Sequence, residues 1–186
     1  MQPVEQHLSD EITARLNADR ADVPAELYAS LRRLAQHRLG QFQQAPTLSA
    51  TALVNEAWLK LAASDPHWKS RRHFMAAMAK VMRHVLVDHA RERQAQRRGG
   101  DLQRITFEGI DGDADAQLEV SELIAIDQAL ARLREFDLRL EQVFELRFFA
   151  GLTIDEVAET LGVSAPTVKR DLRAARAYIA AEFEAR

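Results

Sequence analysis

The feature that most constrains the fold is the helical spacing of apolar residues along nearly all of the 186-residue chain. Sustained alternation of apolar and polar residues, which is the pattern of a half-buried strand, is absent, and Ala, Leu, Arg and Glu dominate. The apolar stripes predict helices over about 4–18, 24–39, 49–62 and 71–93, and the helical pattern resumes near Leu118. We therefore predict an all-α protein.

A stretch rich in glycine and aspartate interrupts the helical pattern. Gly99 and Gly100 end the fourth predicted helix, and further glycines follow among aspartates. Exposed backbone of this composition is typical of a flexible linker. We predict two helical domains, 1–96 and 118–186, joined by a flexible acidic linker over 97–117.

The charges are segregated along the chain, although the formal net charge is only −3. Lys60 to Arg104 contains eleven Lys or Arg residues against four acids, and 105–127 contains seven acids and no Lys or Arg. In the helix over 71–93, we expect Lys80, Arg83 and Arg91 to lie away from the apolar stripe. The basic half is therefore predicted to present a surface that faces phosphates.

The composition also excludes several classes of protein. The chain has no cysteine, which excludes disulfides and thiolate metal sites. No apolar run approaches the roughly 20 residues that span a bilayer. The first ten residues carry acids and lack a basic, apolar leader. We expect a cytoplasmic protein with no membrane insertion, no bound metal and no cofactor.

The most specific local pattern lies near the C-terminus. Thr153 followed by Glu156 is the spacing of a capping box at the start of a short helix. Gly162 supplies a turn, and Ser164 precedes a second helix with Pro166 in its first turn. Two helices joined by such a turn are typical of a helix-turn-helix.

The last helix is predicted to have two distinct faces. Its apolar stripe consists of Val168, Leu172, Ala175 and Ile179. Its free face carries Lys169, Arg170 and Arg173, with Arg176 at the flank. In a helix-turn-helix this helix enters the major groove, where Arg and Lys reach base edges and phosphates. The alternative is a helical hairpin whose charged face is only solvated.

These motifs resemble a known family. GLTIDEVAETLGVSAPTVKRDLRAARAYI (151–179) is similar to region 4 of sigma factors. ALVNEAWLKLA (52–62) and HFMAAMAKVMRHVLVDHARERQAQRR (73–98) resemble the paired helices of region 2. Their order and spacing, and the linker between them, resemble the small two-domain sigma factors of the extracytoplasmic-function (ECF) class.

The resemblance implies a division of labour. Region 2 would bind the clamp of the largest subunit of core RNA polymerase and capture the non-template strand of the −10 element. Region 4 would read the −35 duplex of promoter DNA and contact the polymerase flap. The protein would not be an enzyme, because the polymerase performs the chemistry.

The resemblance also implies site residues. Those expected at the −35 duplex are Arg147, Pro166, Thr167, Lys169, Arg170, Arg173 and Arg176. Those expected at the −10 strand are Trp68, Lys69, Arg71, Arg72, His73, Lys80, Arg83 and His84. Asn55 and Glu56 are expected to contact core polymerase. The residue pattern leaves open whether Trp68 stacks on a base or packs in its loop, and whether the cations from Arg91 onward bind phosphate.

One departure from the family pattern suggests how the protein is controlled. Relatives carry an acidic run where this chain has Ala50-Thr51-Ala52, with Ser49 just before it. Phosphorylation restores negative charge at a hydroxyl. We hypothesise that a Ser/Thr kinase modifies Thr51, or alternatively Ser49, and that this replaces release from an anti-sigma factor. The other interpretation is that both hydroxyls simply cap the helix.

Two rival functions remain open. The chain could be a helix-turn-helix transcription regulator that acts without joining core polymerase. It could also be a helical metal enzyme, because His84 and Asp88 have i, i+4 spacing and His89 follows. The metal-enzyme hypothesis lacks an evident third residue to bind the metal.

Overall fold

The computed structural model describes residues 3–18, 23–40, 48–64, 67–96 and 120–184. Regular structure within these ranges is entirely helical, which confirms the predicted all-α class. The linker predicted over 97–117 lies outside the described residues.

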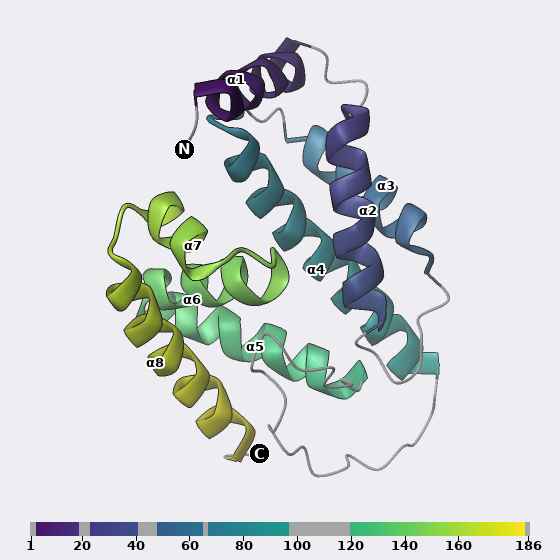
Figure 1. Cartoon of the computed structure of the whole chain (residues 1–186). Helices are drawn as coiled ribbons and strands as arrows, with labels where there is room; N and C mark the ends of the chain where they lie inside the picture. The colour runs from purple at the N-terminus through teal and green to yellow at the C-terminus, as the bar shows by residue number, and fades with distance from the viewer. Residues whose placement is uncertain (1–2, 19–22, 41–47, 65–66, 97–119, 185–186) are drawn as a thin grey trace.

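The first half of the chain is built around one long helix. Its elements are α1 (Pro3–Ala18), α2 (Ala25–Gly40), α3 (Ala50–Ala62) and α4 (Arg71–Gln96). Helices α1, α2 and α3 all contact α4, which runs through the middle of the molecule (Figure 1). The chain enters α4 through Ser70, whose Oγ accepts a hydrogen bond from His73 N at 3.1 Å. This serine therefore serves as the N-terminal cap of the basic helix.

The second half forms a smaller helical unit. Its elements are α5 (Val120–Phe136), α6 (Leu138–Phe144), a π-helical turn η1 (Glu145–Phe149), α7 (Ile154–Leu161) and α8 (Ala165–Glu184). Asp137 separates α5 from α6, and its carboxylate accepts from Arg139 N at 2.9 Å and Leu140 N at 3.2 Å. Helix α8 packs against α5, α6 and α7. The predicted apolar stripe of α8 is confirmed, because all four of its residues are buried.

The two halves meet along α4. Helix α5 and the η1 turn both pack against it, so the buried apolar cluster continues from one half into the other. Phe74 and Met78 of α4 and Phe144 of α6 are among the fully buried side chains. The prediction that 1–96 and 118–186 fold separately stays a prediction.

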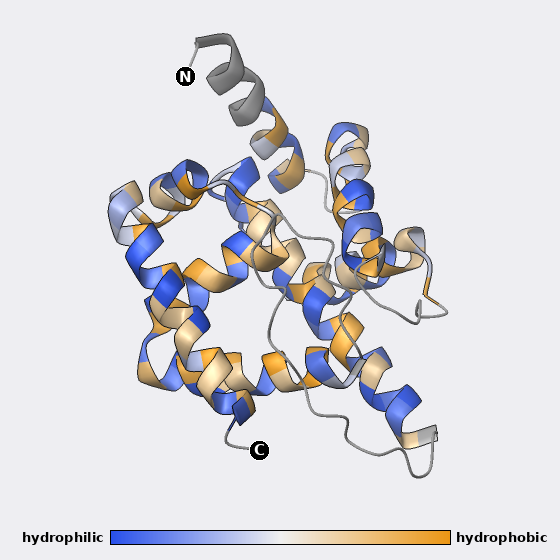
Figure 2. Cartoon of the chain, turned by 60° about the horizontal axis from the view of Figure 1, so that its bottom comes forward, coloured by the Kyte–Doolittle hydropathy of each residue, from blue (hydrophilic) through white to orange (hydrophobic). Residues whose placement is uncertain are grey.

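Hydrophobic and hydrophilic residues alternate around the helices, as expected for helices that each bury one face (Figure 2). Across the described ranges, every helix is too short or too polar to cross a membrane.

Candidate nucleic-acid interface

The turn between α7 and α8 is defined by local hydrogen bonds. Thr153 Oγ1 accepts from Glu156 N at 3.2 Å, and Thr153 N donates to the Glu156 carboxylate at 2.8 Å, so the predicted capping box is confirmed. Gly162 ends α7 with φ 68°, a left-handed conformation that favours glycine. Ser164 Oγ then accepts from Thr167 N at 3.3 Å at the start of α8. These sequence-local contacts therefore define the start and end of α7 and the start of α8.

Three cations form the exposed face of α8. Lys169, Arg170 and Arg173 all project into solvent on the side opposite the buried stripe. We call these three residues the α8 basic face. Buried Asp171 lies beneath it and receives Arg139 Nε at 2.7 Å and the Arg170 guanidinium at 3.0 Å. This carboxylate restrains Arg170 while leaving Lys169 and Arg173 on the surface.

The remaining residues expected at the duplex lie around this face. Pro166 is exposed in the first turn of α8, and Thr167 is half-buried beside Ser164. Arg176 is half-buried further along the helix. Arg147 lies instead in the η1 turn, where it donates to the Leu152 carbonyl at 3.2 Å. Its observed contact therefore stabilises the loop before α7.

In the first half, the structure resolves the open question about Trp68 in favour of packing. Its side chain is 3 % exposed and packs edge-on against Phe74, with ring centroids 5.1 Å apart. Its backbone is held by Asn17, whose side chain donates to the Trp68 carbonyl at 2.9 Å and accepts from the amide at 2.8 Å. Trp68 is therefore not positioned to stack on a base in this conformation.

The residues around Trp68 remain accessible to different degrees. Lys69 and His73 are exposed, whereas Arg71 and Arg72 are half-buried. Although His73 is exposed, the desolvation of its ring, followed by the neighbouring Lys69 cation, lowers its pKa. Arg72 reaches across to α7 and pairs with Glu159 at 2.7 Å.

The expectation that Arg83 lies on an exposed basic surface is wrong. The residue is 4 % exposed, because α5 and η1 cover this side of α4. Its guanidinium binds the Glu145 carboxylate with Nε–O distances of 3.1 and 3.0 Å, and it also pairs with Asp127. The helical period of α4 correctly predicted that Arg83 lies away from the apolar stripe. It could not predict that α5 and η1 pack over the side of the helix that carries Arg83.

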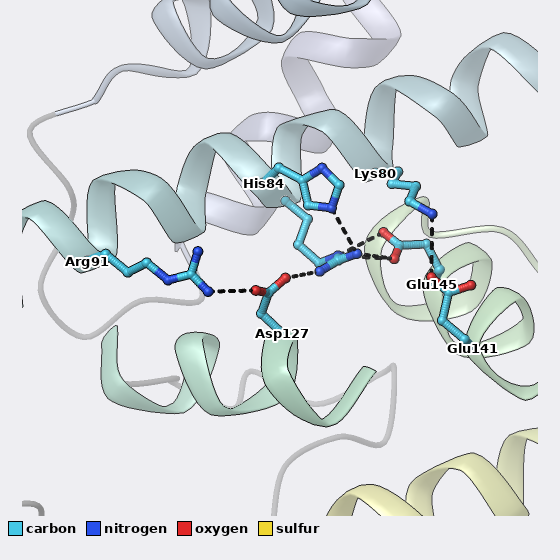
Figure 3. Close-up of polar contacts among 7 residues, drawn as sticks. Lys80, His84, Arg91, Asp127, Glu141 and Glu145 are labelled. Atoms are coloured by element: carbon cyan, nitrogen blue, oxygen red, sulfur yellow. Dashed lines mark hydrogen bonds and ion pairs between the residues drawn. The ribbon is translucent and has the colours of Figure 1, made fainter. Parts of the chain in front are cut away.

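Neighbouring cations of α4 are paired in the same way (Figure 3). Lys80 Nζ lies 3.5 Å from Glu141 of α6, and Arg91 lies 3.1 Å from the second carboxylate oxygen of Asp127. His84 Nε2 is 3.3 Å from the Arg83 guanidinium. Partial burial, followed by the charge of Arg83, lowers the pKa of His84.

Sequence reasoning missed the acids that make these contacts. Glu141 and Glu145 are buried among aromatic and aliphatic neighbours, and burial raises the pKa of Glu145 although Arg83 opposes the shift. Glu145 also begins the π-helical turn, a distortion that often marks functional sites. The sequence offered one usable signal, namely acids at the helical spacing of 141 and 145 within an apolar segment.

Aromatic residues of the second half also contact cations of the first. Arg38 of α2 lies 5.0 Å from the centroid of the Phe148 ring and donates to the Phe149 carbonyl at 3.3 Å. Arg83 lies 5.4 Å from the centroid of the Phe149 ring. Burial, followed by the nearby Arg147 charge, lowers the pKa of Arg38 to about 10. The junction between the halves thus combines ionic and cation–π contacts.

The α3 residues expected to contact polymerase form part of an exposed face. Ser49 caps the helix by accepting from Ala52 N at 3.1 Å, and Thr51 and Asn55 are exposed. Glu56 points toward α4, where it approaches His89 at 3.2 Å. Leu59, which sequence reasoning missed, follows Asn55 by one turn and is 70 % exposed. Only the packing of α3 shows that this leucine is outside the core.

Two of the residues that suggested a metal enzyme, Asp88 and His89, contact other side chains instead. Asp88 binds Lys60 Nζ at 2.9 Å, and His89 faces Glu56 rather than a second histidine. Across the described residues, no group of three or more histidines and acids has the geometry to hold a metal ion.

One comparison with known proteins identifies the chain. A family model described as ECF sigma factor matches residues 10–185, which is nearly the whole chain. Comparisons with curated proteins and with solved structures gave no match.

Proposed function

The chain belongs to the family of ECF sigma factors, which direct transcription initiation by RNA polymerase, and we propose how its two halves divide that task. In this proposal, the second half reads the −35 duplex through α8 and also contacts the polymerase flap. The first half captures the −10 strand and binds the polymerase clamp. The protein acts in the cytoplasm with the polymerase.

The α8 basic face is the observation that carries the proposal. Its cations stand at the N-terminal part of the second helix of the α7–α8 pair, where a helix-turn-helix contacts bases. The pair is held by the capping box, by Gly162 and by Ser164, so the cations are presented by a rigid support. Such preorganisation favours specific contacts over diffuse attraction.

Transcription in vitro with core polymerase tests this assignment. Lys169→Ala/Arg173→Ala should abolish most promoter-specific transcripts while the protein still binds core. A matched control, Arg32→Ala/Arg134→Ala, removes two exposed arginines from α2 and α5 and should transcribe normally. Specific duplex binding without any core-dependent transcripts, even after kinase treatment, would support the rival regulator instead.

Strand capture is assigned to the basic residues near the start of α4. Lys69 and Arg71 have no role in the ion pairs described above and lie beside the capped start of the helix. Unpaired DNA is held by such backbone-facing charge, together with stacking. Lys69→Ala/Arg71→Ala should slow promoter opening, followed by permanganate reactivity of unpaired thymines, and leave duplex binding unchanged. Normal opening would show that these cations are only solvated.

Core binding is assigned to the exposed face of α3. Thr51, Asn55 and Leu59 follow one another at one-turn intervals, and all three are exposed. An exposed leucine beside polar groups is typical of a protein contact. Leu59→Ala or Asn55→Ala should weaken affinity for core polymerase. The control Ala63→Ser changes an exposed position at the end of the same helix and should not.

Control is assigned to phosphorylation of Thr51. Ser49 already uses its hydroxyl as the cap, whereas Thr51 is exposed in a first turn that contains no acid. A phosphate there adds a charge of about −1.5 to −2 near the positive end of the helix dipole. We expect the modified protein to bind core more tightly than the unmodified one.

The kinase proposal is tested by comparing affinities for core polymerase. Kinase treatment should strengthen binding of the wild-type protein and have no effect on Thr51→Ala. Ser49→Ala should still respond, which separates modification from capping. Full affinity of the untreated protein would contradict the proposal and leave an anti-sigma partner as the candidate switch.

A further inference from the structure

The buried charged groups of this protein gather at one place. The described residues include five buried charged side chains, and four of them, Arg38, Arg83, Glu141 and Glu145, lie where the two halves meet. The fifth, Asp171, lies beneath the α8 basic face. Such groups are costly to bury, so their concentration at one interface calls for a reason other than stability.

Four cations of α4 each face an acid from a different element of the second half. Arg72 meets Glu159 of α7, Lys80 meets Glu141 of α6, Arg83 meets Glu145 of η1, and Arg91 meets Asp127 of α5. Asp127 also binds Arg83. We call Asp127, Glu141, Glu145 and Glu159 the latch acids. They occupy one side of α4 along most of its length.

Three of the four cations that the latch acids bind, Arg72, Lys80 and Arg83, are among those that the family resemblance assigns to the −10 strand. The proposed function assigns capture of that strand to the start of the same helix. Carboxylates and phosphates compete for the same donors, because arginine binds both through paired N–H groups. While Glu145 and Asp127 hold the Arg83 guanidinium, it has no free edge to offer a phosphate. The second half thus takes the place of the nucleic acid on α4.

We propose that the latch acids form an autoinhibitory contact, in which the second half of the free protein shields α4 from single-stranded promoter DNA until the halves separate. The inference rests on the proposed role of α4 in strand capture. An ionic contact suits a reversible closure, because the desolvation cost of its charges offsets much of their attraction. The ion pairs themselves therefore add little to the free energy that a polyanion or a polymerase surface must supply to open the contact.

The absence of cysteine allows the closure to be measured directly. Spin labels on Ala29→Cys of α2 and Ala177→Cys of α8, both exposed positions, report the separation of the halves. The latch variant is Asp127→Asn/Glu145→Gln. Its charge-matched control is Asp88→Asn/Glu182→Gln, whose acids pair with Lys60 and Arg132 within their own halves. Circular dichroism verifies that every variant retains its helices.

The wild-type protein and the control should give one narrow distance distribution, and the latch variant a longer and broader one. Affinity for a single-stranded thymine oligonucleotide of about 15 nucleotides, at fixed salt, should rise about tenfold in the latch variant, as expected if closure is favoured about tenfold. Unchanged distances would overturn the proposal. Longer distances with unchanged oligonucleotide affinity would also overturn it, because the acids would then join the halves without shielding α4.

A second variant and the independence of the distance measurement from polymerase complete the test. If the latch variant does not fold, Glu159→Lys replaces an exposed acid with a charge that repels Arg72, and it should shift both readouts in the same direction by less. The distance measurement needs neither polymerase nor promoter. If the latch variant opens and binds the oligonucleotide more tightly but supports no core-dependent transcription, the autoinhibitory contact is upheld and the proposed function is rejected. If transcription is normal while the distances and the oligonucleotide affinity are unchanged, the proposed function is upheld and the autoinhibitory contact is rejected.

Discussion

Helices α4 and α8 carry similar rows of cations, yet the tertiary structure leaves them in different states. The cations of α8 project into solvent, with one buried acid restraining Arg170 from beneath. Four of the cations of α4 are paired with acids from the other half of the chain, and one of these four, Arg83, is buried. Both helices begin with a serine cap, so the difference does not arise from the helices themselves. Charge content therefore identifies a potential DNA surface, whereas packing decides whether that surface is available.

The largest expected effect is on closure when the buried cation of α4 is removed. Arg83→Ala leaves Glu145 buried without its partner, which costs the closed arrangement about 3–5 kcal/mol. That exceeds a tenfold preference for closure, which is about 1.4 kcal/mol. The spin-label distances should therefore become those of the open form, whereas Arg173→Ala on α8 should leave them unchanged.

A matched double variant sharpens this test. Arg83→Met/Glu145→Leu removes both charges and keeps apolar volume in the junction, so the chain should stay closed. If Arg83→Ala stays closed as well, the apolar contacts alone hold the halves together. The cations of α4 would then differ from those of α8 only in being covered, and the ion pairs would not contribute to closure.

The next largest effect concerns what the α8 cations read. Replacing an arginine that reads a base with alanine should weaken duplex binding by on the order of 1–3 kcal/mol. The same substitution should relax sequence specificity at the one base pair that the arginine contacts. A phosphate contact should weaken binding to all sequences alike and reduce the salt slope by about 1. Binding titrations of Arg173→Ala and Lys169→Ala against promoter variants distinguish the two roles, and no change in either variant would remove α8 from the interface.

The two serine caps offer a smaller and more symmetrical comparison. Ser70→Ala and Ser164→Ala each remove a side-chain acceptor at a helix start, and each should lower the free energy of unfolding by about 1 kcal/mol. Only Ser164→Ala should weaken duplex binding, because it loosens the first turn of α8. Chemical denaturation and fluorescence anisotropy measure the two quantities, and equal losses of duplex affinity would contradict the separate roles of the helices.

The smallest expected effect is a pH dependence of closure through His84. Burial is the largest cause that lowers the pKa of His84 from 6.5 in the closed form. Because Arg83 stays beside His84 on α4 in both forms, it is the relief of burial that makes protonation favour the open form. The contribution of His84 to closure is therefore complete above pH 6.5 and is lost as the pH falls from there through the lowered pKa.

The environment of His84 determines how this effect is isolated. Lys80 lowers its pKa further, whereas Asp127 and Asp88 oppose the shift. Glu145 acts in the opposite sense on closure, since its raised pKa favours the closed form as the pH falls. Distances measured at about pH 7.5 and pH 5.5 should show more opening at the lower pH in the wild-type protein than in His84→Gln. Identical responses would assign the pH dependence to other groups.

Much of this architecture was predictable because its causes are local. The helix bounds, the Thr153 capping box and the stripe from Val168 to Ile179 follow from caps and from a period of 3.6 residues. The family could be identified for the same reason, since its motifs lie on those helices. The buried state of Trp68 was left open, because a loop side chain has no periodicity to follow.

By itself, the sequence determined the helices, the segregation of charge and the presence of two rows of cations. The tertiary structure alone decided that α4 is covered on a second side, so that Glu145 and Asp127 meet Arg83 although more than 40 residues of chain separate each pair. The physical reason is that helical periodicity records which face of a helix is apolar, whereas an ionic contact between distant helices leaves no periodic trace in either. Availability of the α4 cations is therefore a property of the packed chain.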